Sequence, residues 1–590
     1  MAQAATGYNK SFESTVIAAL EFNQKLDFLT EGLSFKALAS FKNWSSSTNA
    51  RAGKWNRFAL TGYEEDGNGG YTYTTSRIGD EFQTDLTTTN STSGDRRFYL
   101  EGMLNYSRTF DEHDINAMFI YSQDEYVNNV PGNGNFIGSL PKRKQGIAAR
   151  ASYAYAGKYM AEVNVGYNGS ENFAKGHRFG LFPSVAVGYN ISEENFFKPL
   201  KNTISKLKLR ASWGLVGNDQ ISDARFLYMS QINLSGKGFT TGVNQNVTYS
   251  GPVYQRYANE DITWEVGEKI NFGVDLQLFR SLDLTFDIFR ENRRDIFQEK
   301  QTVPTYMGTA STKVYGNLAA MRNQGFELAA SYNKQFNKDW FVSFKGTFTY
   351  AHNEITKYDE SPKYPWQSKV GASANMNAIY IADGLFIDSE DIAHHQQQLG
   401  STIVPGDIKY VNVSRDWYGY DDNLTDTDDW VWAKYPSVPE IVYGFGPSIK
   451  WKNLDFSFFF QGVAKTSFMV KDMHPFGDNS LRNVLSWIAD ERWSPDNQNT
   501  NATYPRLSRK TNANNTKLST YWQRNGAFLK LKNAEIGYTH KNMRIYISGS
   551  NLLTFAPFKL WDPEQGGGSG LSYPTQRVFN IGFQMTINNK

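Results

Sequence analysis

The segment FNIGFQMTIN, from Phe579 to Asn588, alternates at every step between an apolar side chain and a polar residue or glycine. In an extended chain, successive side chains point to opposite faces, so the two kinds separate. One face would carry Phe579, Ile581, Phe583, Met585 and Ile587, and the other Asn580, Gly582, Gln584, Thr586 and Asn588. A strand that crosses a bilayer needs this division, because one face meets lipid and the other meets a polar lumen. The segment therefore predicts a transmembrane β-strand.

The same alternation recurs along the chain. Further segments of this kind start near Lys206, Lys269, Leu282 and Leu454, with charged or amide side chains opposite Leu, Ile, Val and Phe. We count roughly 16 to 18 such segments, most of about ten or more residues, which is longer than the strands of soluble sheets. Helical periodicity is hardly visible. We therefore predict an all-β fold, a transmembrane antiparallel β-barrel.

The predicted connections between strands fall into two length classes. Short polar links predict tight hairpins at 279–281, 337–339, 452–453 and 540–542. Long loops lie between these pairs, at about 217–260, 296–322, 354–439, 465–523 and 555–574. Short turns on one side and long loops on the other are typical of outer-membrane barrels. Tyr538 and Tyr546 lie near strand ends, where the aromatic girdles of such barrels are expected.

The composition of the 590-residue chain excludes several function classes. Lys plus Arg total 61 and Asp plus Glu 59, so the net charge of +2 provides no field for nucleic acid, and we expect no nucleic-acid partner. The chain has no cysteine, which excludes disulfides, thiolate metal sites and cysteine nucleophiles. Aromatic residues reach 15%, about twice the share expected of a globular protein. Mean hydropathy is -0.54, and no window predicts a transmembrane helix.

Catalytic motifs are missing from the sequence. We find no GxSxG, no HExxH and no phosphate-binding glycine loop, so we expect that the protein is not an enzyme. His394 and His395 are adjacent, but no third ligand follows at a suitable spacing, and we interpret them as surface histidines.

Specific strings resemble the barrel of SusC/RagA-type TonB-dependent outer-membrane transporters, in the family's order and over nearly the whole chain. They are RFGLFPSVAVGYNISEENFF (178–197), LKLRASWGLVGND (207–219), ITWEVGEKINFGVDLQLF (262–279), YGNLAAMRNQGFELAASYN (315–333), YGFGPSIKWKNLDFSFFFQG (443–462), and FLKLKNAEIGYT, RIYISGSNLLTF and YPTQRVFNIGFQMTI near the end. In the fourth string, Gly325 follows a polar pair, so we expect it to take a positive φ at the start of a strand.

The resemblance implies active import through the cell outer membrane. Family members carry a signal sequence, a small N-terminal β-sandwich extension, a TonB box, a plug and then about 22 barrel strands. The first four are not visible in this sequence, so we expect residues 1–590 to be an N-terminally truncated barrel domain, with 354–439 and 465–523 as long extracellular loops. The implied partners are a SusD-like surface lipoprotein, outer-membrane lipid, and the TonB–ExbB–ExbD complex, reached through the missing N-terminal region.

The cargo class stays open at this point. An oligosaccharide or other glycan is expected first, because the resembled family most often serves glycan use, and peptides come second. A siderophore or cobalamin receptor is a further alternative. Outside this class, the alternatives are a porin and a soluble β-sandwich glycan-binding protein, although strand length and loop asymmetry argue against the sandwich.

The 354–439 loop is long enough that a binding role is expected. Its candidate contact residues are Trp366, Trp417, Tyr418, Tyr420, Trp430 and Trp432. Aromatic faces stack on sugar rings while neighbouring carboxylates accept hydrogen bonds from hydroxyl groups. The same residue types suit the docking of a protein lid. We expect these residues to contact substrate or the SusD-like lipoprotein.

A calcium site is an open alternative in the same loop. After the segment PGDIKY (405–410), the resemblance implies an Asp-rich, glycine-containing run similar to a calcium loop. The candidate ligands are Asn412, Ser414, Asp416, Asp421 and Asp422. Trp417 stands where the glycine is expected, so a solvated acidic outer loop is the other interpretation. No other cofactor is expected.

Overall fold

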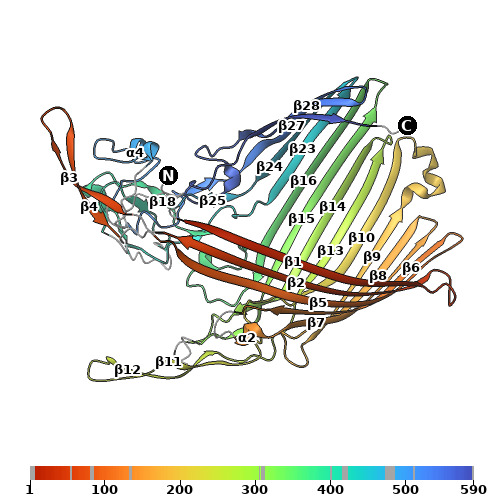
Figure 1. The fold of residues 1–590 in the computed structure, drawn as a ribbon, viewed down its shortest axis with the longest axis horizontal. Helices are drawn as coiled ribbons and strands as arrows, with labels where there is room; N and C mark the ends of the chain where they lie inside the picture. Colours follow the sequence, from red (N-terminus) through yellow and green to blue (C-terminus); the bar gives the residue numbers. More distant parts are fainter. Residues whose placement is uncertain are drawn as a thin grey trace. The chain divides into compact units, whose positions relative to one another are not determined.

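The computed structural model describes residues 7–53, 56–79, 85–131, 136–304, 306, 312–398, 402–414, 423–471, 485–508 and 512–587. The chain divides into two compact units. The first comprises residues 1–153, 163–182 and 223–226, and the second comprises residues 154–162, 183–222 and 227–590. Strands dominate the chain, as Figure 1 shows.

Seventeen of the described strands belong to one antiparallel sheet, within the predicted range. Their lengths range from 8 residues in β29 to 24 residues in β5. In chain order they are β1 (Gly7–Lys25), β2 (Leu33–Ala52), β5 (Thr87–Phe110), β6 (His113–Asn128), β7 (Lys142–Tyr155), β8 (Tyr159–Ser170), β9 (Phe179–Asn190), β10 (Ile204–Asn218), β13 (Glu265–Leu278), β14 (Leu282–Glu299), β15 (Tyr315–Gln335), β16 (Trp340–Lys357), β23 (Ile441–Trp451), β24 (Leu454–Ala464), β27 (Phe528–His540), β28 (Met543–Phe555) and β29 (Val578–Met585). The all-β prediction is confirmed.

In the first unit, β2 pairs with β1 on one side and with β5 on the other, and β5 pairs with β6. A separate hairpin of β3 (Arg57–Glu65) and β4 (Tyr71–Ile78) follows β2. A short helix, α2 (Phe136–Ser139), precedes β7. The buried Arg225 donates hydrogen bonds to the carbonyl oxygens of Ile137, Leu140 and Pro141, at 3.0, 2.7 and 2.7 Å. These bonds fix the backbone around α2.

In the second unit, the sheet strands pair in the order of the chain, from β9 to β29. Strands β13 to β16 lie side by side in the middle of Figure 1. The predicted tight hairpins are confirmed, and residues of their turns have positive φ: 52° at Phe279, 54° at Arg280, 53° at Lys452 and 53° at Lys541. Such dihedral angles match the right-handed twist of hairpin strands.

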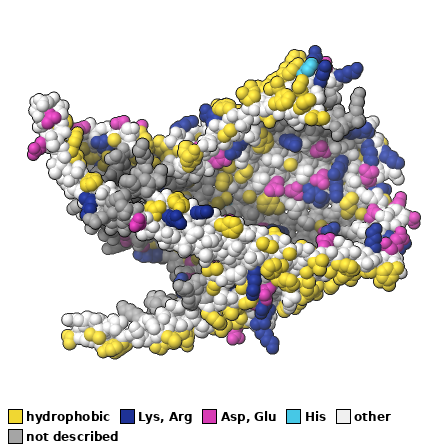
Figure 2. All heavy atoms as spheres, in the orientation of Figure 1, with side chains coloured by type: hydrophobic (Ala, Val, Ile, Leu, Met, Phe, Trp, Pro, Cys, Tyr) yellow, Lys and Arg dark blue, Asp and Glu magenta, His cyan; other side chains and the backbone are white. Residues whose placement is uncertain are grey.

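Large apolar side chains lie exposed on one face of these strands. Phe272 of β13 retains 46% of its exposure and Ile288 of β14 retains 51%, although they face each other across the two strands. Figure 2 shows hydrophobic side chains gathered over β27 and β28 as well. A soluble sheet would bury such a face against a second layer. An exposed apolar face on long alternating strands fits contact with lipid.

Charged side chains gather on the other face, as Figure 2 shows. Arg210 of β10 reaches across β13, with its Nη2 atom 3.0 Å from Asp275 and 3.1 Å from Asp287 of β14. A Cβ on Gly273 would lie only 2.7 Å from that Nη2 atom, so glycine makes room for the crossing. A second arginine repeats the arrangement over Gly537. This second cluster consists of Arg544, Asp455 and Glu535.

The two faces should respond differently to one added charge. We expect Ile288→Lys to destabilise the folded protein by about 2–4 kcal/mol, because it places an ammonium group in the apolar face. Thr285→Lys, on the charged face of the same strand, should cost about 1 kcal/mol or less. The yield of folded protein in purified outer membranes checks both variants. Equal yields would contradict the assignment of the apolar face to lipid.

Three details of the sequence interpretation are wrong. The loop expected at 296–322 is shorter, because β14 continues to Glu299 and β15 begins at Tyr315. Gly325 therefore lies inside β15, where a Cβ would come within 1.9 Å of the carbonyl oxygen of Tyr350. Close approach of β16, and not a positive φ, requires glycine there. Tyr546 lies under the Arg544 guanidinium, 4.8 Å from its ring centre, and not in a girdle.

The 217–260 region is not a plain loop. It contains a hairpin of β11 (Gln231–Thr241) and β12 (Val247–Arg256). Among the described residues, no helix is long and apolar enough to cross a membrane.

Candidate binding site in the long loops

Three connections of the second unit, 358–440, 465–527 and 556–577, fold together, and we call them the loop cluster. The first contains η4 (Pro365–Gln367), β17 (Ala378–Ile379), β18 (Ala382–Leu385), α3 (Ser389–His394), β19 (Gln397–Gln398), β20 (Ile408–Tyr410), β21 (Leu424–Thr425) and β22 (Val431–Trp432). The second contains β25 (Ser467–Met469), α4 (Ser486–Glu491) and β26 (Gln523–Asn525), and the third contains η6 (Pro563–Gln565). Two-stranded pairings join β17 to β22, β18 to β20, β19 to β21 and β25 to β26.

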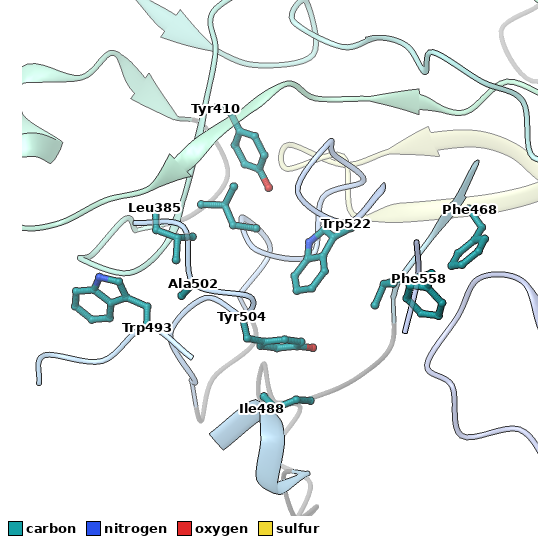
Figure 3. Packing of buried hydrophobic residues seen from close by; sticks show 11 residues of the cluster. Leu385, Tyr410, Phe468, Ile488, Trp493, Ala502, Tyr504, Trp522 and Phe558 are labelled. Atoms are coloured by element: carbon teal, nitrogen blue, oxygen red, sulfur yellow. The ribbon is translucent and has the colours of Figure 1, made fainter. Parts of the chain in front are cut away.

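The loop cluster has its own hydrophobic core, drawn in Figure 3. The first connection contributes Leu385, Ile408 and Tyr410, the second Phe468, Val470, Ile488, Trp493, Ala502, Tyr504 and Trp522, and the third Phe558. The rings of Tyr504 and Trp522 meet edge to face, with centroids 5.1 Å apart. Burial of one large apolar side chain contributes about 1.5–3 kcal/mol, so the ten that accompany Ala502 can hold three long connections in one arrangement.

A buried carboxylate joins the first two connections. Asp407, of the PGDIKY segment, has no solvent exposure. Its Oδ1 atom lies 2.7 Å from the Arg506 guanidinium and accepts hydrogen bonds from the amides of Asn512 and Asn515, at 2.9 and 3.0 Å. Its Oδ2 atom accepts one from the backbone N–H of Val404, at 3.0 Å. All the acceptor capacity of Asp407 is thus used within the loop cluster.

Two buried asparagines complete this junction. The side chain of Asn514 accepts from Gln398 at 2.9 Å and donates to the carbonyl oxygen of Ile408 at 2.8 Å. The Asn515 side chain accepts from the backbone N–H of Ile408 at 2.9 Å. The Tyr410 hydroxyl donates to the Asn514 carbonyl oxygen at 2.7 Å. Since buried polar groups are costly unless paired, this network selects one fit between the two connections.

A buried lysine fastens the third connection. Lys530 of β27 has no solvent exposure, and its Nζ atom lies 2.5 Å from Asp562 and 2.6 Å from Glu564. The neighbouring Lys532, which is partly exposed, lies 2.5 Å from Glu564. Burial raises the pKa of both carboxyl groups, but hydrogen bonds outweigh burial and hold both pKa values below the ordinary range. Asp562 accepts them from Lys530 and from the backbone N–H of Glu564, and Glu564 accepts them from Lys530 and Lys532.

The third connection should therefore loosen in acid. A carboxyl group whose pKa is lowered by folding stabilises the fold above its ordinary pKa, and this contribution disappears as the pH falls through the lowered value. We expect hydrogen exchange in 556–577 to speed up below roughly pH 4, after correction for the intrinsic pH dependence of exchange. Amides of β1 and β2 serve as the internal reference. Equal behaviour of the two regions would contradict the prediction.

The described part of the predicted aromatic site is one assembled patch, which we call the tryptophan patch: Trp366, Trp430 and Trp432. The Trp366 indole N–H donates to the carbonyl oxygen of Asp428 at 3.2 Å, and the Trp432 indole N–H donates to that of Ser368 at 2.6 Å. The Trp430 and Trp432 rings meet edge to face, 5.2 Å apart. All three side chains are partly buried, so ring surface remains available to a ligand.

Asp428 gives the tryptophan patch its charge. Lys363 forms an ion pair with this carboxylate, and the hydrogen bond raises the pKa of Lys363. Burial and then the nearby Asp428 raise the pKa of Tyr364, whose ring stacks on Trp366 with centroids 4.5 Å apart. Aromatic faces, a carboxylate, a phenol and an ammonium group therefore lie together. Such a surface can stack against a ring and exchange hydrogen bonds with hydroxyl groups.

The candidate calcium ligands that the structure describes are engaged elsewhere. Asn412 and Ser414 are buried, and the Ser414 hydroxyl lies 3.1 Å from Asn412 Oδ1 and 3.0 Å from Asp429 Oδ1. Asp429 also accepts backbone N–H groups of Val413, Ser414 and Asp426, at 2.7, 2.9 and 2.8 Å. A carboxylate with this many donors holds the loop without an ion. Within the described ranges, no three His, Asp or Glu side chains converge as a metal site.

The other predicted site residues lie outside the described residues: Asp416, Trp417, Tyr418, Tyr420, Asp421 and Asp422. The calcium alternative, which depends on three of them, stays a prediction. His394 ends α3 and bonds to the carbonyl oxygen of Glu390, and His395 contacts the Phe386 ring edge to face.

Sequence reasoning missed the residues that hold the site together. Asp407 was visible only as part of a family-like string, and Asn514, Asn515 and Lys530 looked like ordinary polar residues of a loop and a lumen face. The one available signal was the PGDIKY segment, whose proline and glycine mark a tight turn directly before Asp407.

Comparison with known proteins matches the chain to one family. A family model described as "TonB dependent receptor-like, beta-barrel" matches residues 4–552. TonB-dependent receptor P3 of Formosa agariphila is 25% identical over 634 aligned residues, covering 98% of this chain and 58% of the relative. TonB-dependent receptor SusC of Bacteroides thetaiotaomicron is 25% identical over 461, covering 74% of this chain and 43% of the relative.

Among solved structures, a RagAB peptide transporter superposes on this chain with a TM-score of 0.72 at 19% identity. The superposition covers 99% of this chain and 63% of the other. At this identity the likeness shows the fold alone. The chain spans about half the length of the curated relatives it matches.

Proposed function

Because the chain belongs to the family of TonB-dependent receptor-like β-barrels, we propose that it forms the membrane-spanning part of a nutrient importer in the outer membrane. The resemblance to SusC/RagA-type transporters is confirmed, since SusC of Bacteroides thetaiotaomicron is among its relatives. The alternative of a soluble β-sandwich is wrong, because the family match covers the barrel strands from β1 to β28.

One observation carries this proposal: long strands expose apolar side chains on one face and place charged clusters on the other. The apolar face meets lipid, and the face with Arg210 and Arg544 lines the path of a hydrophilic solute. The loop cluster lies at the ends of β16, β23, β24, β27 and β28 that are opposite the tight turns. In this proposal it faces the cell exterior and receives the cargo.

The cargo that we propose is an oligosaccharide. The tryptophan patch supports this class, because it combines ring faces with a carboxylate and a phenol, as sugar binding requires. A peptide is the alternative from the same family. A SusD-like lipoprotein is the proposed partner at the loop cluster, and the TonB–ExbB–ExbD complex is the proposed source of energy for import.

Uptake in cells tests the cargo class. A strain that lacks the gene and a complemented strain should receive labelled oligosaccharides and labelled peptides of matched size. We expect gene-dependent uptake of at least one oligosaccharide and of no peptide. Gene-dependent uptake of peptides alone would replace the glycan proposal with the peptide alternative.

The tryptophan patch should limit this uptake. Replacing Trp430 and Trp432 with alanine removes two ring faces, each of which contributes about 1 kcal/mol to stacking, so we expect uptake at low substrate concentration to fall roughly thirtyfold. Tyr573→Ala, which removes a ring that is 79% exposed in the third connection, is the control. Unchanged uptake at normal surface expression would exclude the tryptophan patch from substrate and lid contact.

A further inference from the structure

A pocket of about 290 Å³ lies inside the loop cluster, apart from the tryptophan patch. Its walls come from β18, from the 500–503 segment, from the residues that precede β26 and from β26 itself. The lining residues are Ala382, Gly384, Thr500, Asn501, Ala502, Thr503, Thr520, Tyr521 and Arg524. This volume is at the lower end for ligand sites, so the pocket suits one ring or one charged group.

The walls of this pocket are fixed by hydrogen bonds and by the hydrophobic core. The backbone N–H of Leu385 donates to the carbonyl oxygen of Thr500 at 3.0 Å, and the Tyr521 hydroxyl donates to that of Ala502 at 2.7 Å. Leu385, Ala502 and Trp522 all belong to the core of the loop cluster (Figure 3). A ligand would therefore meet a site that is already formed, which lowers the entropic cost of binding.

Arg524 gives the pocket an unbalanced positive charge. Its Nη1 atom donates to the carbonyl oxygens of Tyr521 and Gln523, at 2.6 and 3.1 Å, which holds the guanidinium in place. Among the residues that the structure describes, no carboxylate pairs with Arg524. Burial lowers the pKa of Arg524, as expected for a cation that lacks a counter-ion. Within the described ranges, its Nε and Nη2 atoms make no hydrogen bond, so these donors can serve a ligand.

The remaining polar groups of the pocket can donate hydrogen bonds as well. The Thr520 oxygen accepts from the backbone N–H of Ala382 at 2.9 Å, so its own hydrogen is available to another acceptor. Thr500, Asn501 and Thr503, whose side chains carry hydroxyl and amide groups, also line the pocket. Arginine binds carboxylates and sulfates with two parallel hydrogen bonds, and hydroxyl and amide groups complement the hydroxyls of a sugar ring.

We propose that this pocket, which we call the Arg524 pocket, binds the anionic group of a saccharide, either a uronate carboxylate or a sulfate ester. The proposal rests on the proposed function, since it narrows the cargo from oligosaccharides to acidic ones. A peptide carboxylate could pair with Arg524 equally well. The three threonines and Asn501, however, can exchange hydrogen bonds with the several hydroxyl groups of a sugar ring.

Binding to the purified full-length protein in detergent tests the proposal without transport. The probes are trigalacturonate, a trisaccharide with one sulfate ester, maltotriose and trialanine, measured by calorimetry. We expect one of the two acidic saccharides to bind at least tenfold more tightly than maltotriose and trialanine, and the stronger of the two identifies the anion. Equal affinity for maltotriose, or tighter binding of trialanine, would overturn the proposal.

Variants test whether the preference for acidic saccharides arises in the Arg524 pocket. Arg524→Gln should abolish this preference. Arg524→Lys should weaken it, because lysine lacks the planar guanidinium group that forms two parallel hydrogen bonds. Lys559→Gln, which removes the same charge from an exposed position of the third connection, should leave it unchanged. If Arg524→Gln does not fold, Thr503→Val tests the same wall, and we expect severalfold weaker binding of the acidic saccharide. A preference that survives in the folded Arg524 or Thr503 variant overturns the assignment.

The experiments distinguish failure of the Arg524 pocket proposal from failure of the proposed function. Gene-dependent uptake of neutral oligosaccharides without any acidic preference would retain the importer and overturn the Arg524 pocket. Binding of acidic saccharides by a protein that imports nothing would retain the pocket and overturn the importer.

Discussion

Replacing Asp407 with alanine is expected to separate the first and second connections of the loop cluster. The substitution leaves the Arg506 guanidinium and the amides of Asn512 and Asn515 without their shared acceptor in a buried position. Breaking a buried charge pair from one side costs about 3–5 kcal/mol. Because the hydrophobic core of the loop cluster combines both connections, its ring contacts should loosen together.

Near-ultraviolet circular dichroism and trypsin cleavage after Arg506 measure this loss. The aromatic signal should fall and cleavage should accelerate, while the strands stay intact. Asp490→Ala, which removes an exposed carboxylate at the end of α4, is the matched control and should behave like the parent. A parent-like Asp407→Ala variant would show that the polar junction does not hold the connections together.

Replacing Lys530 with alanine is expected to release the third connection from β27. Asp562 and Glu564 then lose the ammonium group that lies 2.5 and 2.6 Å away, and both are partly buried. We expect a cost of about 3–5 kcal/mol, since the two carboxylates stay behind without their main counter-ion. Phe558 and Trp561, which follow the start of this connection, should detach from the core.

Trypsin cleavage after Lys559 reports this release directly. Lys532→Ala is the matched control, because it removes a lysine two residues away that is 23% exposed and that, among the described residues, pairs with Glu564 as its one carboxylate. Its effect should be about 1 kcal/mol or less. Equal cleavage in both variants would contradict the dominant role of the buried Lys530.

Much of the sheet was predictable because its signal is local. A two-residue period follows from the backbone of an extended chain. The alternation alone therefore assigns Phe272 to the apolar face and Asp275 to the polar face, without knowledge of the neighbouring strands. The turns at Phe279 and Lys452 were predictable for the same reason, since short polar links between alternating segments leave only tight hairpins.

The loop cluster could not be predicted because its contacts join distant residues. In the sequence, Lys530 looks like an ordinary polar position of an alternating strand. In the structure it is buried against Asp562 and Glu564, which lie more than thirty residues away in the sequence. The same holds for the network of Asn514 and Asn515, whose partners lie about one hundred residues earlier. Position near a strand end was also misleading: it suggested Tyr546 as a girdle residue, although Arg544 lies over its ring.

Energy dependence of uptake tests the central claim of import most directly. Cells that carry the intact gene should accumulate a labelled oligosaccharide, and an uncoupler that collapses the proton gradient should reduce accumulation to the level of the strain without the gene. Transport driven through TonB requires that gradient, whereas diffusion through a porin does not. Gene-dependent accumulation that persists unchanged with the uncoupler would contradict active import and would identify the protein as a passive pore.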